Sequence, residues 1–447
     1  MYGIISLLQN PDYTGEGMAA KKKKEPRGIS EKTDKDILQK ILKITEDIHN
    51  ISDIDILLDK ILFEVRKFTN AEAGTIFLTE GNNLRISYTQ NDILFGKSIS
   101  NRYKYLNHEI PINETSMAGC AAFTGKLIVV DDAYKINPKE KFIFNRDFDN
   151  SSGYRTKSVL NMPLKTARNR VIGVMQIINA RDEKGKVVPF SEKDEIYVSY
   201  FANDAAIAIE KAITTRQMVL RMLRMVEFRD PKETGGHVNR MGAYSVEIYH
   251  QWAKDRGFPP ELIRRFKDKL RIAAMLHDAG KIAIPDSILK KPAKLEPDEF
   301  STMKMHTIFG YRLFESKDSE IDAMAAEIAL AHHEKWDGTG YPGRITDVMN
   351  LKKLDSAPGK TDLEIPVTGR IVAVADVYDA LVSKRIYKEP WDESRVVEYI
   401  KDNAGRHFDP EVVDAFMGVY DVIAAIRDKY TEDKEQEEQA PNPDSVK

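Results

Sequence analysis

The chain has 447 residues, of which 42% are hydrophobic and 31% charged, and a formal net charge of −3. This length and composition predict a globular protein of two domains, and the small net charge gives no reason to expect a nucleic-acid polymer or an anionic membrane as partner. A single cysteine, Cys120, excludes disulfides within the chain and thiolate metal clusters, and no apolar run approaches the roughly 20 residues of a membrane helix. With no signal-peptide pattern at its start, the sequence favours a cytoplasmic protein.

The amino-terminal part predicts a tail followed by a mixed domain. Residues 1–29 include the run KKKKEPRG and are typical of a disordered basic tail, in which Met18 is an alternative start. In residues 30–195, apolar side chains first recur at helical spacing, and strand-like segments follow, separated by Gly, Asn and Asp turns. These segments are AGTIFLTE, NLRISYTQ, KLIVVDDA, SVLNMPLK and VIGVMQIINA. A helix followed by mostly antiparallel strands predicts an α+β sensor domain.

A long helix is predicted over residues 196–226, where apolar and small residues step by three and four positions without a break. The residues of this seam are Val198, Phe201, Ala205, Ala208, Ala212, Thr215, Val219, Met222 and Val226. A heptad seam is typical of two helices that pack side by side, so we favour a parallel homodimer through residues 196–226 that carries a signal from sensor to output. The alternative is a helix packed on its own domain.

Residues 227–428 are helical in pattern throughout and predict an all-α bundle, followed by an acidic disordered tail over 429–447. This part holds seven of the nine histidines of the chain. Together with nearby acidic residues they supply eight possible metal ligands: Glu233, His237, His277, Asp278, His306, His332, His333 and Asp376. Burying a single imidazole or carboxylate without a partner would cost free energy. Several of them around a shared metal ion offset this cost, because each binds the ion. We therefore predict a di-metal site within the helical bundle.

The chemistry of these donors narrows the metal and the reaction. Imidazole and carboxylate without sulfur fit iron, manganese or zinc. His277 and Asp278 are neighbours, so on a helix their side chains would diverge by about 100°, and Asp278 could bridge two ions while His277 binds one of them. Two such ions favour in-line displacement at a phosphodiester. Lys281 follows within a helical turn and is within reach of a phosphate oxygen; its alternative is an ordinary surface lysine.

The stretches HDAGKIAIPDSIL, HHEKWDGTGYPG, RIVAVADVYDALVSKRIYK and GRHFDPEVVDAF resemble the HD-GYP family of HD phosphohydrolases over roughly residues 227–420. The resemblance implies hydrolysis of cyclic di-GMP at a centre of two or three divalent ions, iron first and manganese as the alternative. It implies that Asp278 bridges the metals and that the substrate is bound by Gly340, Tyr341, Pro342, Arg385 and Lys388. Together with the position of Lys281, this makes Asp278 and Lys281 the expected catalytic residues and adds Lys281 to the expected substrate-binding residues.

Two positions carry particular weight within this resemblance. Family members with a third metal are similar in having a carboxylate four residues before the first ligand histidine, which implies that Glu233 binds a third ion; the alternative is a capping or solvent-facing glutamate. Residues 344–364 form a link longer than is usual in the family. We expect this insertion to affect the entrance for the substrate rather than the metal ligands.

The first half resembles a GAF domain over about residues 40–212, on the same strand-like segments. Cyclic-nucleotide-binding GAF domains share a pattern that Asn179, Phe190, Asp194 and Glu195 match here, but Ala180 stands where the pattern has lysine. Binding of a cyclic nucleotide is therefore not favoured, and the GAF ligand stays unknown. For Cys120 and His108 we prefer ordinary structural roles to haem or redox sensing.

Three functions compete at this stage. The favoured one is a GAF-regulated phosphodiesterase that hydrolyses cyclic di-GMP to the linear dinucleotide and on to GMP. The second is an HD-type hydrolase of another cyclic dinucleotide. The third is a non-catalytic nucleotide-binding signalling module, against which the complete ligand set argues.

Overall fold

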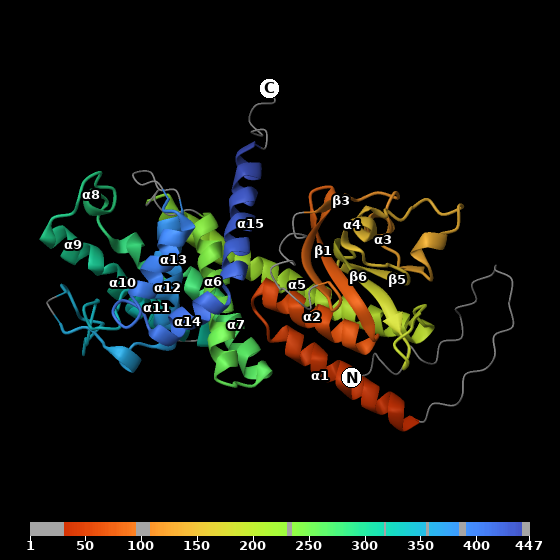
Figure 1. Ribbon diagram of the computed structural model, residues 1–447, viewed down its shortest axis with the longest axis horizontal. Coiled ribbons are helices and arrows are strands. Elements are labelled where there is room, and N and C mark those ends of the chain that lie inside the picture. Colours follow the sequence, from red (N-terminus) through yellow and green to blue (C-terminus); the bar gives the residue numbers. More distant parts are fainter. Residues whose placement is uncertain are drawn as a thin grey trace. The chain divides into compact units, whose positions relative to one another are not determined.

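The computed structural model describes residues 31–94, 108–229, 235–316, 319–354, 357–383 and 390–439 (Figure 1). The described chain opens with helix α1, Glu31–His49, and contains an α+β part followed by an all-α part, as predicted. No helix among these residues combines the length and the apolar character needed to span a bilayer.

The α+β part is built on one antiparallel sheet with strand order β3-β2-β1-β6-β5-β4, and β7 pairs with β6. The strands are β1 Ala71–Glu80, β2 Asn83–Asn91, β3 Glu109–Pro111, β4 Ile128–Val130, β5 Val159–Lys165, β6 Val171–Arg181 and β7 Val187–Val188. The five predicted strand segments correspond to β1, β2, β4, β5 and β6, because alternating apolar residues between Gly and Asn turns are a strong signal for strands. The short strands β3 and β7 were not predicted.

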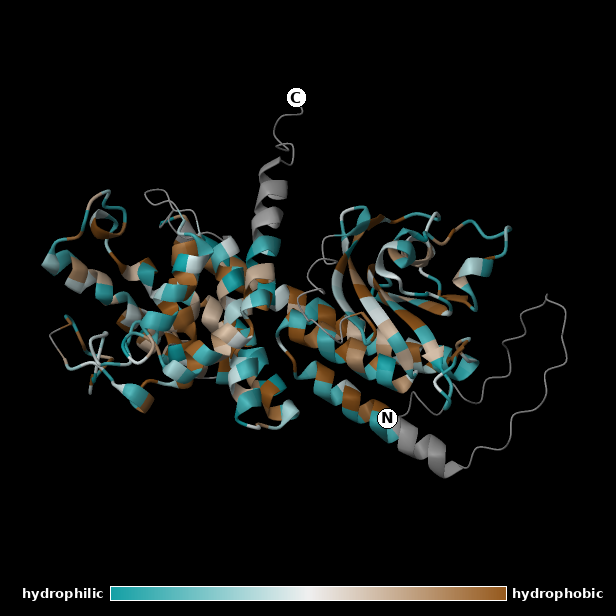
Figure 2. Ribbon diagram, in the orientation of Figure 1, coloured by the Kyte–Doolittle hydropathy of each residue, from teal (hydrophilic) through white to brown (hydrophobic). Residues whose placement is uncertain are grey.

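Helices cover both faces of this sheet (Figure 1). Helix α2, Ile54–Phe68, packs on β1 and β2, where Gly74 leaves room for Leu62. Helix α3, Met117–Thr124, lies on the opposite face, and Ala118 packs there with Phe77 and Val174. The remaining short elements of this part are the 3₁₀ helix η3, Ala133–Lys135, and helix α4, Asp147–Ser152. Brown, apolar residues accordingly recur along the strands in Figure 2.

The long helix predicted over 196–226 is α5, Glu192–Glu227, which begins with a capping box between Ser191 and Asp194. The prediction that this seam packs against a second copy of the helix is wrong for the first half of the seam. The side chains there are no more than 2% exposed within a single chain and pack on α2 and β5: Val198, Phe201, Ala205, Ala208 and Ala212. A helix that covers a sheet has the same three-and-four spacing as a coiled coil, so the sequence alone could not separate the two cases.

The all-α part has one main core, formed largely by helices α6, α7, α11, α12, α14 and α15. Its large, fully buried side chains include Tyr244, Tyr378 and Phe416. The helices of this part are α6 Gly235–Asp255, α7 Pro260–Met275, α8 Asp286–Leu289, α9 Pro297–Lys304, α10 His306–Leu313, α11 Glu320–Ala331, α12 Val367–Val382, α13 Glu393–Asp402, α14 Pro410–Gly418 and α15 Tyr420–Gln439, with 3₁₀ helices η4 Ala279–Ala283 and η5 Asp362–Glu364.

The last helix corrects one expectation: α15 continues to Gln439, so residues 429–439 of the predicted disordered acidic tail are helical. The basic tail over 1–29 lies outside the described residues.

The first part of the insertion over 344–364 packs on a small apolar cluster that is separate from the main core. Ile345, Val348 and Leu351 contact a group of buried side chains that includes Met305 and Ile308. The guanidinium of Arg312 donates from Nε to the carbonyl oxygen of Val348 at 2.9 Å. The segment is therefore anchored beside α10, whose first residue is one of the predicted metal ligands.

Candidate metal centre

Three histidine rings of the predicted site are fixed by backbone carbonyl groups at the ends of helices. Nδ1 of His277 lies 2.9 Å from the carbonyl oxygen of Ala274, and Nδ1 of His306 lies 2.8 Å from that of Met303. Nδ1 of His332 lies 3.0 Å from the carbonyl oxygen of Ile328. A carbonyl oxygen can only accept, so in each ring Nδ1 carries the proton and Nε2 presents its lone pair.

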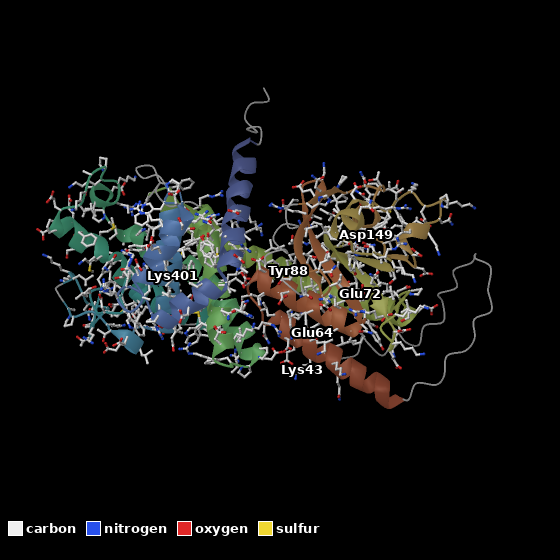
Figure 3. All side chains as sticks on the ribbon, viewed as in Figure 1. Lys43, Glu64, Glu72, Tyr88, Asp149 and Lys401 are labelled. Carbon is white, nitrogen blue, oxygen red and sulfur yellow. The ribbon has the colours of Figure 1, made fainter. Side chains whose placement is uncertain are left out.

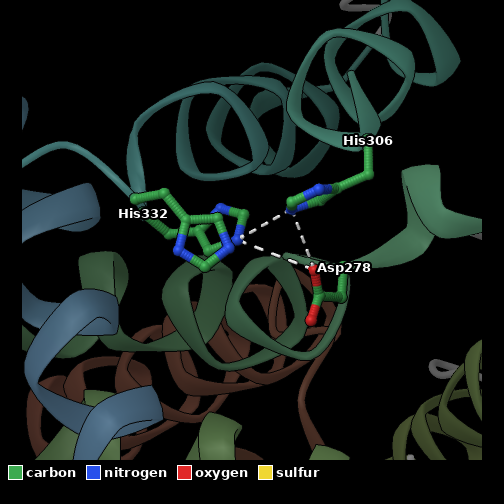
Figure 4. A group of neighbouring side chains, drawn as sticks. Asp278, His306 and His332 are labelled. Carbon is green, nitrogen blue, oxygen red and sulfur yellow. Dashed lines mark hydrogen bonds and ion pairs between the residues drawn. The ribbon is translucent and has the colours of Figure 1, made fainter. Parts of the chain in front are cut away.

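The Nε2 atoms of His306 and His332 converge on Asp278 (Figure 4). Its Oδ1 lies 3.2 Å from Nε2 of His306 and 3.6 Å from Nε2 of His332, and the two Nε2 atoms lie 3.5 Å apart. Within the described residues, Oδ1 accepts no hydrogen bond. Lone pairs that face one another across such distances repel unless a cation lies between them, so the donor set fits a bound metal ion.

The predicted ligands fall into two adjoining groups in which one ligand atom of each residue lies within 4.8 Å of the others. The first group is Asp278, His306, His332 and His333, and the second is His237, His277 and Asp376. The two groups meet where Nε2 of His277 lies 3.3 Å from Oδ2 of Asp278. Seven of the eight predicted ligands are thus brought together, in an arrangement that could hold two metal ions.

The charge state of the site suits metal binding. Burial lowers the pKa of His306 to about 4; the opposite effect of Asp278 is smaller than that of burial, and His332 lowers the pKa further. Burial also holds the pKa of His333 well below its usual range. Burial alone would raise the pKa of Asp278, but Lys281 and His277 outweigh it and hold that pKa well below its ordinary value. Neutral imidazoles and an ionised carboxylate are the ligand forms that metals require.

His277 and Asp278 reach the site from a turn, which corrects the prediction that they lie on a helix. Helix α7 ends at Met275, and the 3₁₀ helix η4 begins at Ala279. Lys281 lies in η4, and its Nζ is 2.7 Å from Oδ2 of Asp278. The predicted catalytic pair is therefore in direct contact, and the lysine charge offsets that of the carboxylate.

The predicted loop of Gly340, Tyr341 and Pro342 lies against the ligands. The ring centroids of Tyr341 and His333 are 4.7 Å apart, and the backbone N–H of Tyr341 donates to the carbonyl oxygen of His333 at 3.1 Å. A Cβ on Gly340 would lie 2.3 Å from the backbone nitrogen of Lys335, so only glycine fits.

Glu334 holds the end of this loop. This residue is only 2% exposed. Its carboxylate accepts hydrogen bonds from the backbone N–H groups of Gly343 at 2.6 Å and Lys360 at 3.1 Å. Burial raises its pKa. The sequence analysis missed this residue; its place directly after two predicted ligands was the available signal.

A second residue that was missed is Asp379, which is 1% exposed. It accepts from Nδ1 of His237 at 2.8 Å and from Nε of Arg240 at 2.6 Å. Although burial opposes this, the hydrogen bonds from Arg240 and His237 hold the pKa of Asp379 well below its ordinary range. Three other predicted site residues, Glu233, Arg385 and Lys388, lie outside the described residues.

In the α+β part, the residues of the cyclic-nucleotide pattern have structural contacts. The amide of Asn179 donates to Glu72 at 2.8 Å and to the carbonyl oxygen of Arg155 at 2.8 Å, and Asp194 caps α5. Figure 3 labels Glu72 among the side chains of this part. Cys120 is buried, and burial raises the pKa of its thiol. Separately, a cavity of about 560 Å³ lies between the sheet and the α3–α4 region.

The fold and the site together define an α+β domain followed by a helical domain with a histidine–aspartate cluster that could hold metal ions. Comparison with known families agrees: the GAF domain model matches residues 53–209, and the HD domain model matches residues 234–381. A second HD domain model matches residues 356–412. The chain therefore contains a GAF domain followed by an HD domain, which confirms the fold class expected from the sequence.

Curated relatives match the HD half. The chain is 40% identical over 220 residues to a cyclic di-GMP phosphodiesterase of Thermotoga maritima, covering 49% of this chain and 52% of that protein. It is 38% identical over 219 residues to a cyclic di-GMP phosphodiesterase of Vibrio cholerae, covering 48% and 41%. It is 37% identical over 214 residues to the 3'3'-cGAMP-specific phosphodiesterase 2 of Vibrio cholerae, covering 48% and 36%. The chain thus spans about half the length of these relatives, or less.

Proposed function

We propose that this protein is a metal-dependent phosphodiesterase that hydrolyses cyclic di-GMP to the linear dinucleotide and on to GMP. The observation that carries the proposal is that the fixed Nε2 atoms of His306 and His332 face Oδ1 of Asp278, which accepts no hydrogen bond from the described residues. The names of the HD-half relatives supply the substrate class. Because one relative is named for 3'3'-cGAMP, hydrolysis of that mixed dinucleotide is the second candidate.

The two ligand groups would hold two divalent ions, with Asp278 between them and Glu233 as ligand of a third. Iron is the proposed metal and manganese the alternative, because all the ligands are nitrogen and oxygen. When bound, such ions polarise a phosphoryl oxygen and lower the pKa of a bound water.

The chain's own groups would place the substrate on this centre. Lys281 would share its charge between Asp278 and a phosphate oxygen, as its 2.7 Å contact with that carboxylate allows. Arg385 and Lys388 would bind phosphate oxygens as well. Gly340, Tyr341 and Pro342 would form one wall of the substrate site, held by the contact of Tyr341 with His333.

The test is product analysis with protein purified without oxygen. Wild-type protein should convert cyclic di-GMP to linear dinucleotide and GMP by chromatography, and 3'3'-cGAMP more slowly. Asp278→Asn and His277→Ala should each abolish turnover while circular dichroism stays that of a folded protein. Near-wild-type turnover in either variant would exclude this centre, and preference for 3'3'-cGAMP would favour the second candidate.

The GAF domain would regulate this activity through a small molecule bound in the 560 Å³ cavity. Its lining combines apolar side chains such as Phe77 and Phe144 with polar ones such as Thr89, Asn91 and Gln176. A concave site with few polar groups is typical of small-molecule binding. The identity of this regulator is not assigned.

The homodimer would use an exposed stripe of α5 that shares Met222 with the predicted seam but otherwise lies beside it. Six large apolar side chains on this helix are between 47% and 60% exposed: Ile196, Tyr200, Ile207, Met218, Met222 and Met225. At 100° per residue they fall within an arc of about 80°, and a helix with the same spacing can cover such a narrow stripe along its length. A second copy of α5 is therefore the proposed occupant.

Light scattering tests the dimer. Wild-type protein should have about twice the 50.9 kDa mass of the chain, and Ile207→Glu with Met218→Glu should have the mass of one chain. Gln217→Glu, an exposed position of α5 outside the stripe, is the matched control and should stay dimeric. A monomeric wild type, or a dimer that survives both stripe substitutions, would contradict the proposal.

A further inference from the structure

Asp379 joins a metal-ligand helix to its neighbour. It lies one turn beyond Asp376 on α12, and its carboxylate faces His237 and Arg240, which are one turn apart on α6. Oδ2 accepts from Nδ1 of His237 at 2.8 Å and from Nη2 of Arg240 at 2.8 Å, and Oδ1 accepts from Nε of Arg240 at 2.6 Å. Both acceptor atoms are thus used, in a residue that is 1% exposed.

His237 differs in this respect from three other histidines of the centre. The rings of His277, His306 and His332 are fixed through Nδ1 by backbone carbonyl groups, which no substitution removes. His237 is fixed through Nδ1 by the side chain of Asp379. With its proton on Nδ1, the ring turns Nε2 toward Asp376, whose Oδ1 lies 4.0 Å away. That gap is of the size that a shared metal ion fills, at about 2 Å from each ligand.

We propose that Asp379 is a positioning residue for metal binding: it fixes the tautomer and the direction of His237 so that Nε2 binds the ion of the His237–His277–Asp376 group. The inference rests on the proposed metal centre and extends it beyond the ligands. Outer partners of this kind typically change metal affinity by about 10–100-fold when they are replaced. The competing explanation is that Asp379 only neutralises Arg240, in which case its loss would affect stability without changing the site.

The variant Asp379→Asn separates these two explanations. An amide has one acceptor oxygen, whereas His237 and Arg240 together direct three donors at this side chain. If the amide NH₂ turns toward His237, Nδ1 must accept, and the ring proton moves to Nε2, where it blocks the metal. If the NH₂ turns toward Arg240, donor faces donor and the side chain loses its fixed orientation.

The experiment titrates metal-free, full-length protein with Mn²⁺ and measures free Mn²⁺ by electron paramagnetic resonance. Wild type should bind Mn²⁺ strongly at both ligand groups, in addition to the third ion proposed at Glu233. Asp379→Asn should weaken the site of the His237–His277–Asp376 group by about 10–100-fold while the site of the other group is unchanged. Asp379→Glu, which keeps two acceptor oxygens, should recover part of the loss. Because the experiment measures metal binding, its result does not depend on whether the protein hydrolyses a cyclic dinucleotide.

Asp409→Asn is the matched control. Asp409 is 2% exposed, pairs with Arg370, and caps α14 by accepting from the N–H of Glu411 at 2.9 Å, but it belongs to neither ligand group. It should lose stability and keep both Mn²⁺ sites.

Nitrogen-15 spectra of histidine-labelled, metal-free protein give a second readout that needs no metal. The Nδ1–H form of His237 in wild type should be lost or mixed in Asp379→Asn. Unchanged Mn²⁺ binding and an unchanged tautomer in a folded Asp379→Asn protein would overturn the proposal. Equal loss of a site in Asp409→Asn would do so too. If Asp379→Asn does not fold, Asp379→Glu provides the test. An Asp379→Glu protein that binds Mn²⁺ with wild-type affinity although His237 carries its proton on Nε2 would refute the proposal.

Discussion

Replacing Glu334 by glutamine tests whether the loop beside the metal ligands is held by one buried carboxylate. Glu334 accepts from the N–H groups of Gly343 and Lys360 with its two oxygens, at 2.6 and 3.1 Å. Glutamine has the same shape but one acceptor oxygen, so one of these N–H groups would face an NH₂ group instead. Losing a hydrogen bond to a charged group costs about 1.5–3 kcal/mol.

Two assays show whether the lost free energy lowers the activity or the stability of the protein. If the loop unfolds on its own, kcat/KM for cyclic di-GMP should drop by about tenfold to a hundredfold, since 1.4 kcal/mol corresponds to one decade. If the loop unfolds only with the domain, urea denaturation of metal-free protein should show the same 1.5–3 kcal/mol as lost stability. Glu364→Gln is the control, because Glu364 also accepts from a backbone N–H, that of Thr361 at 2.9 Å, but is exposed. A Glu334→Gln protein that equals Glu364→Gln in both assays would refute the reasoning.

Two other predictions follow from single residues. Glu233→Ala should lower the metal content of anaerobically purified protein from about three ions per chain to about two and slow the second hydrolytic step; equal content and an unchanged product ratio would make Glu233 an ordinary surface residue. For His407, burial and then Lys335 lower the pKa from an ordinary 6.5 to about 4. Because the folded state favours the neutral imidazole, the contribution of His407 to stability is fully present above pH 6.5 and is lost as the pH falls toward 4. Metal-free wild type should therefore lose up to about 3 kcal/mol more unfolding free energy between pH 7 and 4 than His407→Gln; parallel pH profiles would contradict this assignment.

Much of this architecture could be predicted because its signals are local. The alternation in AGTIFLTE and VIGVMQIINA gave the central strands β1 and β6, and the ligand residues stood out as polar groups in apolar surroundings. The helix expected at His277 and Asp278 failed for a tertiary reason. A Cβ on Gly280 would lie 2.0 Å from the carbonyl oxygen of His306, so the chain leaves α7 early to pass close to α10. No local pattern encodes such an approach.

The partner of α5 could not be predicted for a different reason. The positions from Val198 to Ala212 and the exposed stripe through Ile207 and Met218 both recur at helical spacing, and only the folded sheet determines which face is covered. Asp379 was missed although a signal existed. It stands three residues after Asp376 on an apolar helix, just as Arg240 stands three residues after His237, and this matched spacing indicates two facing helices.

The position of each histidine relative to a helix end explains why Nδ1 of His237 pairs with a carboxylate, whereas Nδ1 of His277, His306 and His332 pairs with backbone carbonyl groups. The carbonyl groups in the last turn of a helix have no partner within the helix. Ala274, Met303 and Ile328 lie in the last turns of α7, α9 and α11, and their carbonyl groups accept from His277, His306 and His332. Each of these rings is therefore oriented by a carbonyl group at a helix end before any metal binds, although that carbonyl group also accepts a backbone N–H, as Ile328 does from His332 at 2.9 Å.

His237 stands at the opposite end of its helix, in the first turn of α6. A helix start presents N–H groups and no unpaired carbonyl group, so the acceptor for Nδ1 must come from another element. Asp379 on α12 provides it, and the same helix carries the ligand Asp376. Docking of α12 on α6 thus completes the second group of ligands, whereas the Nδ1 contacts in the first group form within three or four residues along the chain. We therefore expect substitutions that loosen the α6–α12 contact to weaken the His237–His277–Asp376 site first.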